Sequence, residues 1–270
     1  MLEIILLTYT LAILSGILIG SVSTPLIMSR SVTFGLTMLH SILGGAILGV
    51  FLKIIFSIDV PIPLIATITA IAFSIIAAEL IERGFAEDTA TAFSVSTATT
   101  LTIIFSFYAS SLSSTAVSEA WSYVMGSSSL ATPEDIFKVF IAIILVVPMV
   151  HLLSKEFLYI AFDEEGSKAM GLNVRFYRYT FYSLVALTSA TLASTIGVLV
   201  THVVLATPGA LSIRMSKKRY AFLSYFIAIA MMLAGYLLAR VLNVPPSGGV
   251  GLVSTILILL MVIIREYGHS

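Results

Sequence analysis

The chain has 270 residues, of which 59% are hydrophobic and only 10% are charged, and its mean hydropathy is +1.08. A soluble domain cannot hide that much apolar surface from water, so the composition indicates an integral membrane protein. Basic and acidic residues balance at 14 each, which gives no reason to expect a nucleic-acid partner. The chain has no cysteine, and this excludes disulfides, thiolate metal ligands and thiol catalysis.

Long uncharged apolar segments recur along the whole chain, and a helix needs about 20 such residues to cross the hydrocarbon core of a bilayer. We expect eight clear membrane-spanning helices, at residues 4–27, 34–56, 62–80, 90–112, 136–153, 179–195, 221–240 and 250–264. The first lacks the basic segment that precedes a cleavable signal sequence, so we expect it to remain as a span. The sequence therefore predicts an all-α, multi-pass protein of the plasma membrane, with residues 1–270 forming a single transmembrane domain.

A ninth apolar segment, GVLVTHVVLATPGALSI at residues 197–213, is short and contains Pro208 and Gly209. Proline removes a backbone hydrogen-bond donor, and in lipid the freed groups must be satisfied by protein or by a water-filled cavity. We therefore predict a discontinuous helix that breaks at Pro208 and Gly209. Such a break either lines a transport pathway or is a proline kink that only shapes helix packing.

The distribution of basic residues favours a full crossing by this segment, since Lys and Arg of short loops are retained on the cytoplasmic side. With nine crossings and the N-terminus outside, the cluster RMSKKR at residues 214–219 lies in the cytoplasm. Only Lys53, Lys138 and Arg240 then lie outside. With eight crossings the cluster would lie outside instead. We expect eight to nine transmembrane helices, and we prefer nine.

Two histidines lie within apolar segments, His40 in GLTMLHSILGG and His202 in GVLVTHVVLATPG. Ionisable groups in a membrane usually face a bundle interior or a cavity, and neutral imidazole is a common ligand of divalent transition metals. The two residues are therefore candidates for a cation pathway. Alternatively, each forms a hydrogen bond with a neighbouring helix. Counting along the spans places His40 toward the inner end and His202 toward the outer half, which predicts roles at different steps.

Charged residues gather in the stretch FDEEGSKAMGLNVRFYR at residues 162–178. The preferred topology places this stretch in the cytoplasm, so we expect a short amphiphilic helix outside the bilayer that another protein could bind. The sequence contains no HExxH, Walker A or GxSxG motif. We therefore do not expect the chain to be an enzyme.

Several motifs together resemble a known family. They are FDEEGSKAMGLNV at residues 162–174, EDTA at residues 87–90, the segment around His202, VPPSGG at residues 244–249, and WSYVMGSSSLATPEDI with Tyr123, Gly126, Ser127 and Asp135. In this order and spacing they resemble the permease subunit of ABC transporters for divalent metal ions, the zinc and manganese uptake group. The resemblance extends along nearly the whole chain.

The resemblance implies a role for the cytoplasmic stretch. In this family such a loop forms a coupling helix that docks on a separate ATP-binding subunit, and here Glu164, Ala169, Gly171 and Leu172 would make that contact. Gly171 suits its place because glycine can adopt the left-handed cap that ends a helix. The resemblance also implies a permease homodimer, an external metal-binding protein that delivers the ion, and ATP hydrolysis in the separate subunit. No cofactor would be bound permanently, and a divalent metal ion, zinc, manganese or iron, would be the substrate.

The sequence also departs from the family pattern. In the second span the family usually has an aspartate where this chain has Leu36 and a proline where it has Gly44. Manganese prefers oxygen ligands and zinc accepts imidazole, so histidines without that carboxylate favour zinc. Two other functions stay open: an ABC permease for a metal chelate or cobalamin-type cofactor, and a secondary transporter driven by an ion gradient.

Overall fold

The structure is a computed structural model that describes residues 2–57, 61–113, 131–216 and 218–267, and every regular element in these ranges is a helix. The elements in chain order are α1 (Leu2–Met28), α2 (Val32–Phe56), α3 (Ile62–Glu82), α4 (Glu87–Leu112), α6 (Pro133–Phe162), α7 (Glu164–Ala169), α8 (Val174–Ile196), α9 (Val198–Met215), α10 (Tyr220–Leu242) and α11 (Pro246–Tyr267). The predicted all-α fold is confirmed.

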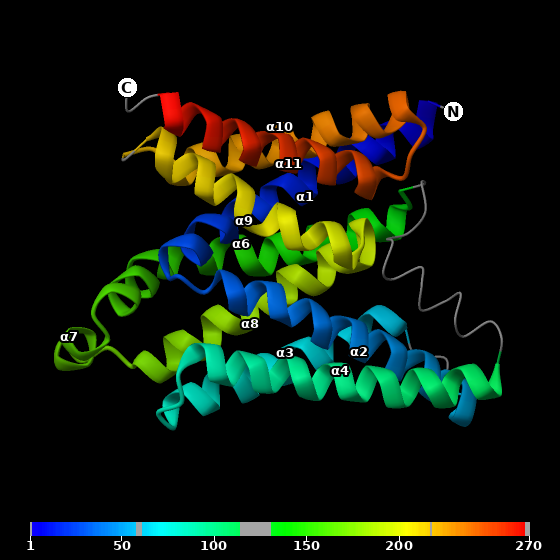
Figure 1. Cartoon of the computed structure of the whole chain (residues 1–270), viewed down its shortest axis with the longest axis horizontal. Helices are drawn as coiled ribbons and strands as arrows, with labels where there is room; N and C mark the ends of the chain where they lie inside the picture. Colours follow the sequence, from blue (N-terminus) through cyan, green and yellow to red (C-terminus); the bar gives the residue numbers. More distant parts are fainter. Residues whose placement is uncertain (1, 58–60, 114–130, 217, 268–270) are drawn as a thin grey trace.

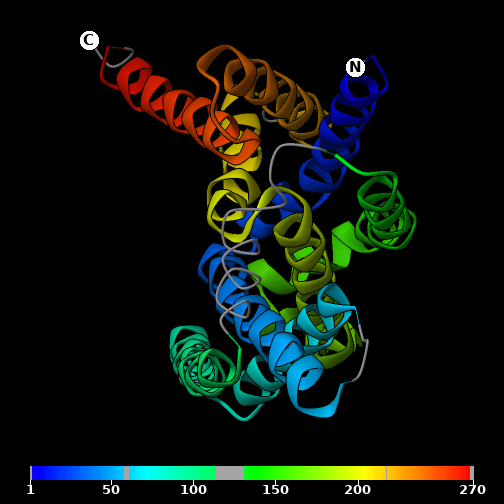
Figure 2. The same ribbon diagram turned by 90° about the vertical axis from the view of Figure 1, so that its right-hand side faces the viewer.

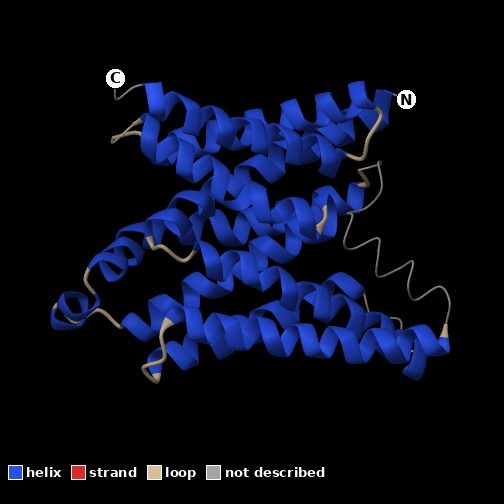
Figure 3. Cartoon of the chain, viewed as in Figure 1, coloured by secondary structure: helices blue, strands red, loops and turns tan. Residues whose placement is uncertain are grey.

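The long helices run back and forth across the molecule (Figures 1 and 3). One edge consists of α2, α3 and α4, the opposite edge of α1, α10 and α11, and α6, α8 and α9 lie between them (Figure 1). Figure 2, turned to look along the helices, separates α4 from α10 and α11 in the same way. The short helix α7 projects at one end of the bundle, where α6 ends and α8 begins (Figure 1).

Seven of the described helices are long and apolar enough to cross a membrane: α1, α2, α3, α4, α6, α9 and α10. Helix α11 adds a shorter apolar stretch at Pro246–Met261. Helix α8 is less apolar, but its 23 residues rise about 34 Å, enough to cross the hydrocarbon core. Besides α7, the described ranges contain nine long helices, which agrees with the expected eight to nine transmembrane helices.

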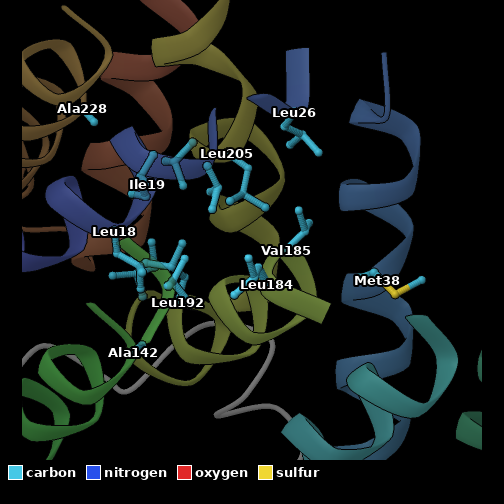
Figure 4. Close-up of a cluster of buried hydrophobic side chains, with 14 of the residues drawn as sticks. Leu18, Ile19, Leu26, Met38, Ala142, Leu184, Val185, Leu192, Leu205 and Ala228 are labelled. Atoms are coloured by element: carbon cyan, nitrogen blue, oxygen red, sulfur yellow. The ribbon is translucent and has the colours of Figure 1, made fainter. Parts of the chain in front are cut away.

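Helix α8 tolerates its polar residues because other helices surround it. Fourteen of its residues are buried, including Thr188, Ser189, Thr191 and Thr195. The hydroxyl of Thr191 donates to the Leu187 carbonyl at 2.9 Å, so it needs no partner on another helix. In the core, Leu184, Val185 and Leu192 of α8 lie near Leu18 and Ile19 of α1 and Leu205 of α9 (Figure 4).

Glycines allow neighbouring helices to approach closely. A Cβ atom added to Gly16 of α1 would lie 2.6 Å from the Ile229 Cα of α10, and one added to Gly20 would lie 2.6 Å from the Tyr225 Cα. The Ser224 hydroxyl of α10 donates to the Gly20 carbonyl at 3.0 Å. This GxxxG pair therefore serves helix packing, its usual role in membranes.

The predicted break at Pro208 and Gly209 is not seen, because Val198–Met215 forms one α-helix. The chain turns instead at Gly197, whose φ of +97° separates α8 from α9. The helix packs closely against α1 at this point: the Gly209 N–H, beside the proline, donates to the Ser23 hydroxyl at 2.7 Å. A Cβ on Gly209 would also lie 2.4 Å from the Ser23 carbonyl oxygen. Protein therefore surrounds the proline-containing stretch, as the cost of unsatisfied backbone groups in lipid requires.

Candidate metal pathway and coupling site

The structure brings His40 of α2 and His202 of α9 together. Their ring centroids are 6.3 Å apart and the rings are nearly perpendicular, at 80°. His40 is exposed on the single chain and His202 is half-buried. The expectation that they occupy different levels of the membrane is therefore wrong. Counting residues along each span cannot show how the helices tilt and cross, and these two helices meet near the two rings.

The hydrogen bonding of His202 bears on what the pair could bind. Its Nδ1 lies 3.0 Å from the Val198 carbonyl oxygen, one turn earlier in α9. A neutral imidazole that donates from Nδ1 to a carbonyl keeps its lone pair on Nε2, as metal-ligating histidines do. The partner carbonyl of His202 thus comes from its own helix, so the ring needs no hydrogen bond from α2.

One chain does not supply a complete metal site here. In the described ranges, no group of three or more His, Asp or Glu side chains is placed to hold a metal ion. Leu36 precedes His40 by one helical turn, where the family has its aspartate, but its side chain lies outside the described atoms. A tetrahedral zinc site needs four ligands, so the two imidazoles of one chain are half of such a set.

The predicted coupling segment forms the short helix α7. Asp163 caps it by accepting a hydrogen bond from the Gly166 N–H at 2.8 Å. After α7, Gly171 adopts a φ of +84°, and the Leu172 N–H donates to the Ser167 carbonyl at 3.1 Å. The left-handed conformation expected at Gly171 is thus present.

The surface around this turn carries apolar side chains. Met170 is 67% exposed and Phe176, at the start of α8, is 54% exposed. Leu172 is half-buried, while Ala169 and Gly171 are exposed. No membrane-spanning helix covers this end of the molecule in Figure 1, where α7 projects. The four residues assigned to coupling therefore lie in one compact turn beyond the ends of the spans.

Ion pairs of Arg178 join α7 to the adjacent ends of α3 and α8. Arg178 of α8 contacts Glu82 of α3 with one nitrogen and lies 2.5 Å from Glu164 of α7 with another. Glu164 also accepts a hydrogen bond from Lys168 at 2.7 Å. Burial acts to raise the pKa of Glu164, but the Lys168 hydrogen bond and the Arg178 charge outweigh it and hold that pKa below its ordinary value.

A second set of contacts joins the same two helices. Glu79 of α3 pairs with Arg83 at 2.9 Å and with Arg175 of α8 at 2.7 Å, and it accepts a hydrogen bond from the Tyr179 hydroxyl. Sequence reasoning did not pair the charged end of α3 with residues 162–178. The only available signal was that both charged stretches were expected on the cytoplasmic side.

Some family motifs have a visible structural role and one cannot be placed. Asp135 is buried and forms a capping box with Thr132 at the start of α6. Tyr123, Gly126 and Ser127 of the same motif lie outside the described residues. Gly209 packs α9 against α1, and Pro208 is buried within the same helix.

Comparisons with known proteins agree with these observations. A manganese transport system membrane protein of Listeria innocua, MntC, is 27% identical over 136 residues, which is 50% of this chain and 49% of that protein. The matched stretch thus spans about half the length of this relative. An uncharacterized membrane protein of Cyanophora paradoxa is 26% identical over 269 residues, covering 95% of this chain and 84% of that protein.

The fold is also found among solved structures. PsaBC from Streptococcus pneumoniae, solved in complex with a Fab, superposes with a TM-score of 0.74 at 24% identity, covering 94% of this chain and 88% of that chain. The model of the ABC 3 transport family matches residues 1–265. The chain therefore belongs to the ABC 3 transport family and is a multi-pass protein of the plasma membrane, as its sequence motifs indicated.

Proposed function

We propose that this chain is the membrane-spanning permease subunit of an ATP-driven ABC importer for a divalent transition metal ion. The observation that carries the proposal is the pair of imidazoles, His40 and His202, which face each other at 6.3 Å on two membrane-crossing helices of an ABC 3 family chain. Two rings at this spacing can contribute ligands to one ion after a small side-chain movement.

The identity of the ion is a choice between zinc and manganese. An imidazole pair with no described carboxylate beside it favours zinc, because manganese prefers oxygen ligands. The name of the Listeria innocua relative supports manganese. Neither ion is a resident cofactor in this proposal, since each is the cargo.

A second copy of the chain would complete the pathway. The exposed His40 ring can meet its counterpart in a homodimer, and two His40 and His202 pairs would supply four imidazoles, the number that a tetrahedral zinc ion takes. A separate ATP-binding subunit would dock on Glu164, Ala169, Gly171 and Leu172 and would hydrolyse the ATP. An external metal-binding protein would deliver the ion to the opposite face.

Uptake into proteoliposomes tests this function. The vesicles contain the chain with its ATP-binding subunit and its external binding protein, and accumulation of Zn²⁺, Mn²⁺ and Fe²⁺ is measured with and without ATP. ATP-dependent accumulation of one ion supports the proposal and names the cargo. If ATP is hydrolysed and no free ion enters, the chelate or cofactor permease replaces it. Accumulation that follows an imposed ion gradient without ATP indicates a secondary transporter.

A further inference from the structure

Among the described basic residues at the cytoplasmic end, Arg178 differs because its side chain is only 10% exposed. It lies in the second turn of α8, and its guanidinium contacts Glu82 of α3 and Glu164 of α7 at the same time. A planar guanidinium can hold two carboxylates in fixed directions, which a lysine ammonium cannot do. One side chain thus connects three helices that are separate along the chain.

The neighbouring ion pairs are of a different kind. Arg175 is 62% exposed, Arg83 is 69% exposed, and Lys168 pairs with Glu164 within α7 itself. Exposed pairs contribute little to stability, whereas a largely buried charge is costly to leave without its partner. The Arg178 contacts should therefore hold their geometry better than the others.

Helix α7 has few other attachments. It is six residues long, and its other described ion pair and its described side-chain hydrogen bonds stay within α7 or reach only Asp163, its own cap. Among the described residues, the pair between Glu164 and Arg178 is the ionic link that leaves the α7 turn for a membrane-crossing helix. Movement of α7 can therefore reach α3 through one side chain.

A cavity of about 170 Å³ lies beside this link, lined by Glu87, Glu164, Arg178, Tyr182 and Ser31 among others. Within the described part of the chain, one carboxylate oxygen of Glu87, Oε1, is buried without a hydrogen-bond partner. Glu87 begins α4 and is close enough to Arg178 for their charges to interact. Ser31 and Tyr182 approach the same carboxylate, but its Oε1 remains as an acceptor for the guanidinium, and the cavity leaves room to move toward it.

We propose that Arg178 is a positioning residue that transmits displacement of α7 to the membrane-crossing helices. It is shared between Glu82 and Glu164 in this conformation, and Glu87 accepts it when α7 shifts. The inference rests on the proposed function, because it assumes that an ATP-binding subunit moves α7. Without Arg178, that subunit would still bind and hydrolyse ATP, but α3 and α4 would no longer follow α7.

The test compares Arg178→Gln with Arg178→Lys and with the matched control Arg175→Gln, which removes an exposed arginine on the same helix that pairs with α3 but not with α7. Three quantities are measured in proteoliposomes: retention of the ATP-binding subunit, ATP turnover, and ions accumulated per ATP hydrolysed. We expect Arg178→Gln to retain the subunit and its turnover while ions per ATP fall about tenfold, within the usual range of coupling free energies. Arg178→Lys should fall in between, and Arg175→Gln should match wild type.

Unchanged ions per ATP in Arg178→Gln would overturn the inference. If that variant does not assemble, Glu82→Gln replaces it, because it cuts the link from Arg178 to α3 and leaves the pair between Arg178 and Glu164 in place. Its control is Glu79→Gln, which removes the pair with the exposed Arg175 on the same two helices.

A separate measurement distinguishes failure of this inference from failure of the proposed function. Hydrogen exchange of the purified full chain reports the attachment of α7 without any transport. Glu164→Gln should speed exchange in α7 and Glu165→Gln should not. Equal exchange in Glu164→Gln and wild type would overturn the inference, whereas a wild-type complex that accumulates no metal ion counts against the proposed function alone.

Discussion

Gly171 combines an unusual backbone conformation with open surroundings. Its φ is +84°, and a Cβ atom built there would meet nothing within 4 Å. An alanine would therefore fit in space but would be strained by about 1–2 kcal/mol in the left-handed region. The constraint on this position is therefore conformational, and a side chain added there would extend into open space.

We predict that Gly171→Glu abolishes binding of the ATP-binding subunit, because it adds both strain and a charged side chain to the docking turn. Gly171→Asn should retain most binding, since asparagine tolerates the left-handed conformation. Co-purification of the subunit with each variant, alongside the elution profile of the variant alone, is the measurement. If Gly171→Glu forms a normal complex, this turn is not part of the docking surface.

The two histidines give a second prediction at the scale of single residues. His40→Ala and His202→Ala should each lower metal uptake by about tenfold or more, as loss of a ligand or its support does at other metal sites, and the ATP-binding subunit should stay bound. His151→Ala is the matched control, because His151 is exposed on α6 and is not part of the pair. If both variants take up metal ions at the wild-type level, the two histidines serve helix packing and are not part of a metal pathway.

At the scale of elements, the close contact between α1 and α10 depends on Gly16 and Gly20. A side chain at Gly16 would run into the Ile229 backbone at 2.6 Å, so Gly16→Leu should destabilise the protein by about 1–3 kcal/mol or more. Gly248→Ala is the control, because its Cβ would meet nothing closer than 3.6 Å. The unfolding midpoint of each variant is measured by heating in detergent. Equal midpoints for Gly16→Leu and Gly248→Ala would show that the close contact between α1 and α10 does not contribute to stability.

The attachment of α7 should depend on pH through Glu164. Its pKa is lowered below the ordinary 4.5 in the folded chain, so its ion pairs stabilise α7 fully above that ordinary value and are lost as pH falls through the lowered pKa. The difference in α7 hydrogen exchange between wild type and Glu164→Gln should be constant from about pH 8 to 6 and should shrink as the pH falls below 4.5. If the difference does not shrink on acidification, the charge of Glu164 is not what attaches the helix.

Elements were easier to predict from the sequence than contacts between them. Apolar length located the membrane-crossing helices, and the charged Ala-x-Gly-Leu run located α7 and its left-handed glycine, because these features depend on local sequence. The distance between His40 and His202 depends on how α2 and α9 cross, and no local sequence pattern determines that crossing. The predicted break at Pro208 was wrong for the same reason: the helix next to it packs against α1, where the Gly209 N–H donates to Ser23.

Arg178 shows the same limit at the candidate coupling site. The sequence placed its charge in the cytoplasmic stretch, but contact with Glu82 requires α3 and α8 to end side by side. The carboxylates of Glu82 and Glu164 meet the guanidinium of Arg178 because the membrane-crossing helices pack against one another. Charge clusters at span ends thus predict where an ion-pair network forms, and the fold decides which residues share a partner.

At the scale of the whole molecule, the nine-crossing topology predicts which loops face each compartment. Helix α9 ends at Met215 on the α7 side, within the RMSKKR cluster, while Val244 follows α10 at the other end of the bundle. An eight-crossing chain would reverse both, because α9 would not cross. The compartment that each loop faces therefore distinguishes nine crossings from eight, and the two loops should face opposite compartments.

The absence of native cysteine makes this topology directly testable, because a single introduced thiol is the only one in the chain. Lys218→Cys and Val244→Cys both replace residues with exposed surface. In intact cells, a membrane-impermeant thiol reagent should label Val244→Cys and should reach Lys218→Cys only after permeabilisation. The reverse pattern would place the RMSKKR cluster outside, leave α9 short of a full crossing, and separate His202 from any pathway that continues to the cytoplasm.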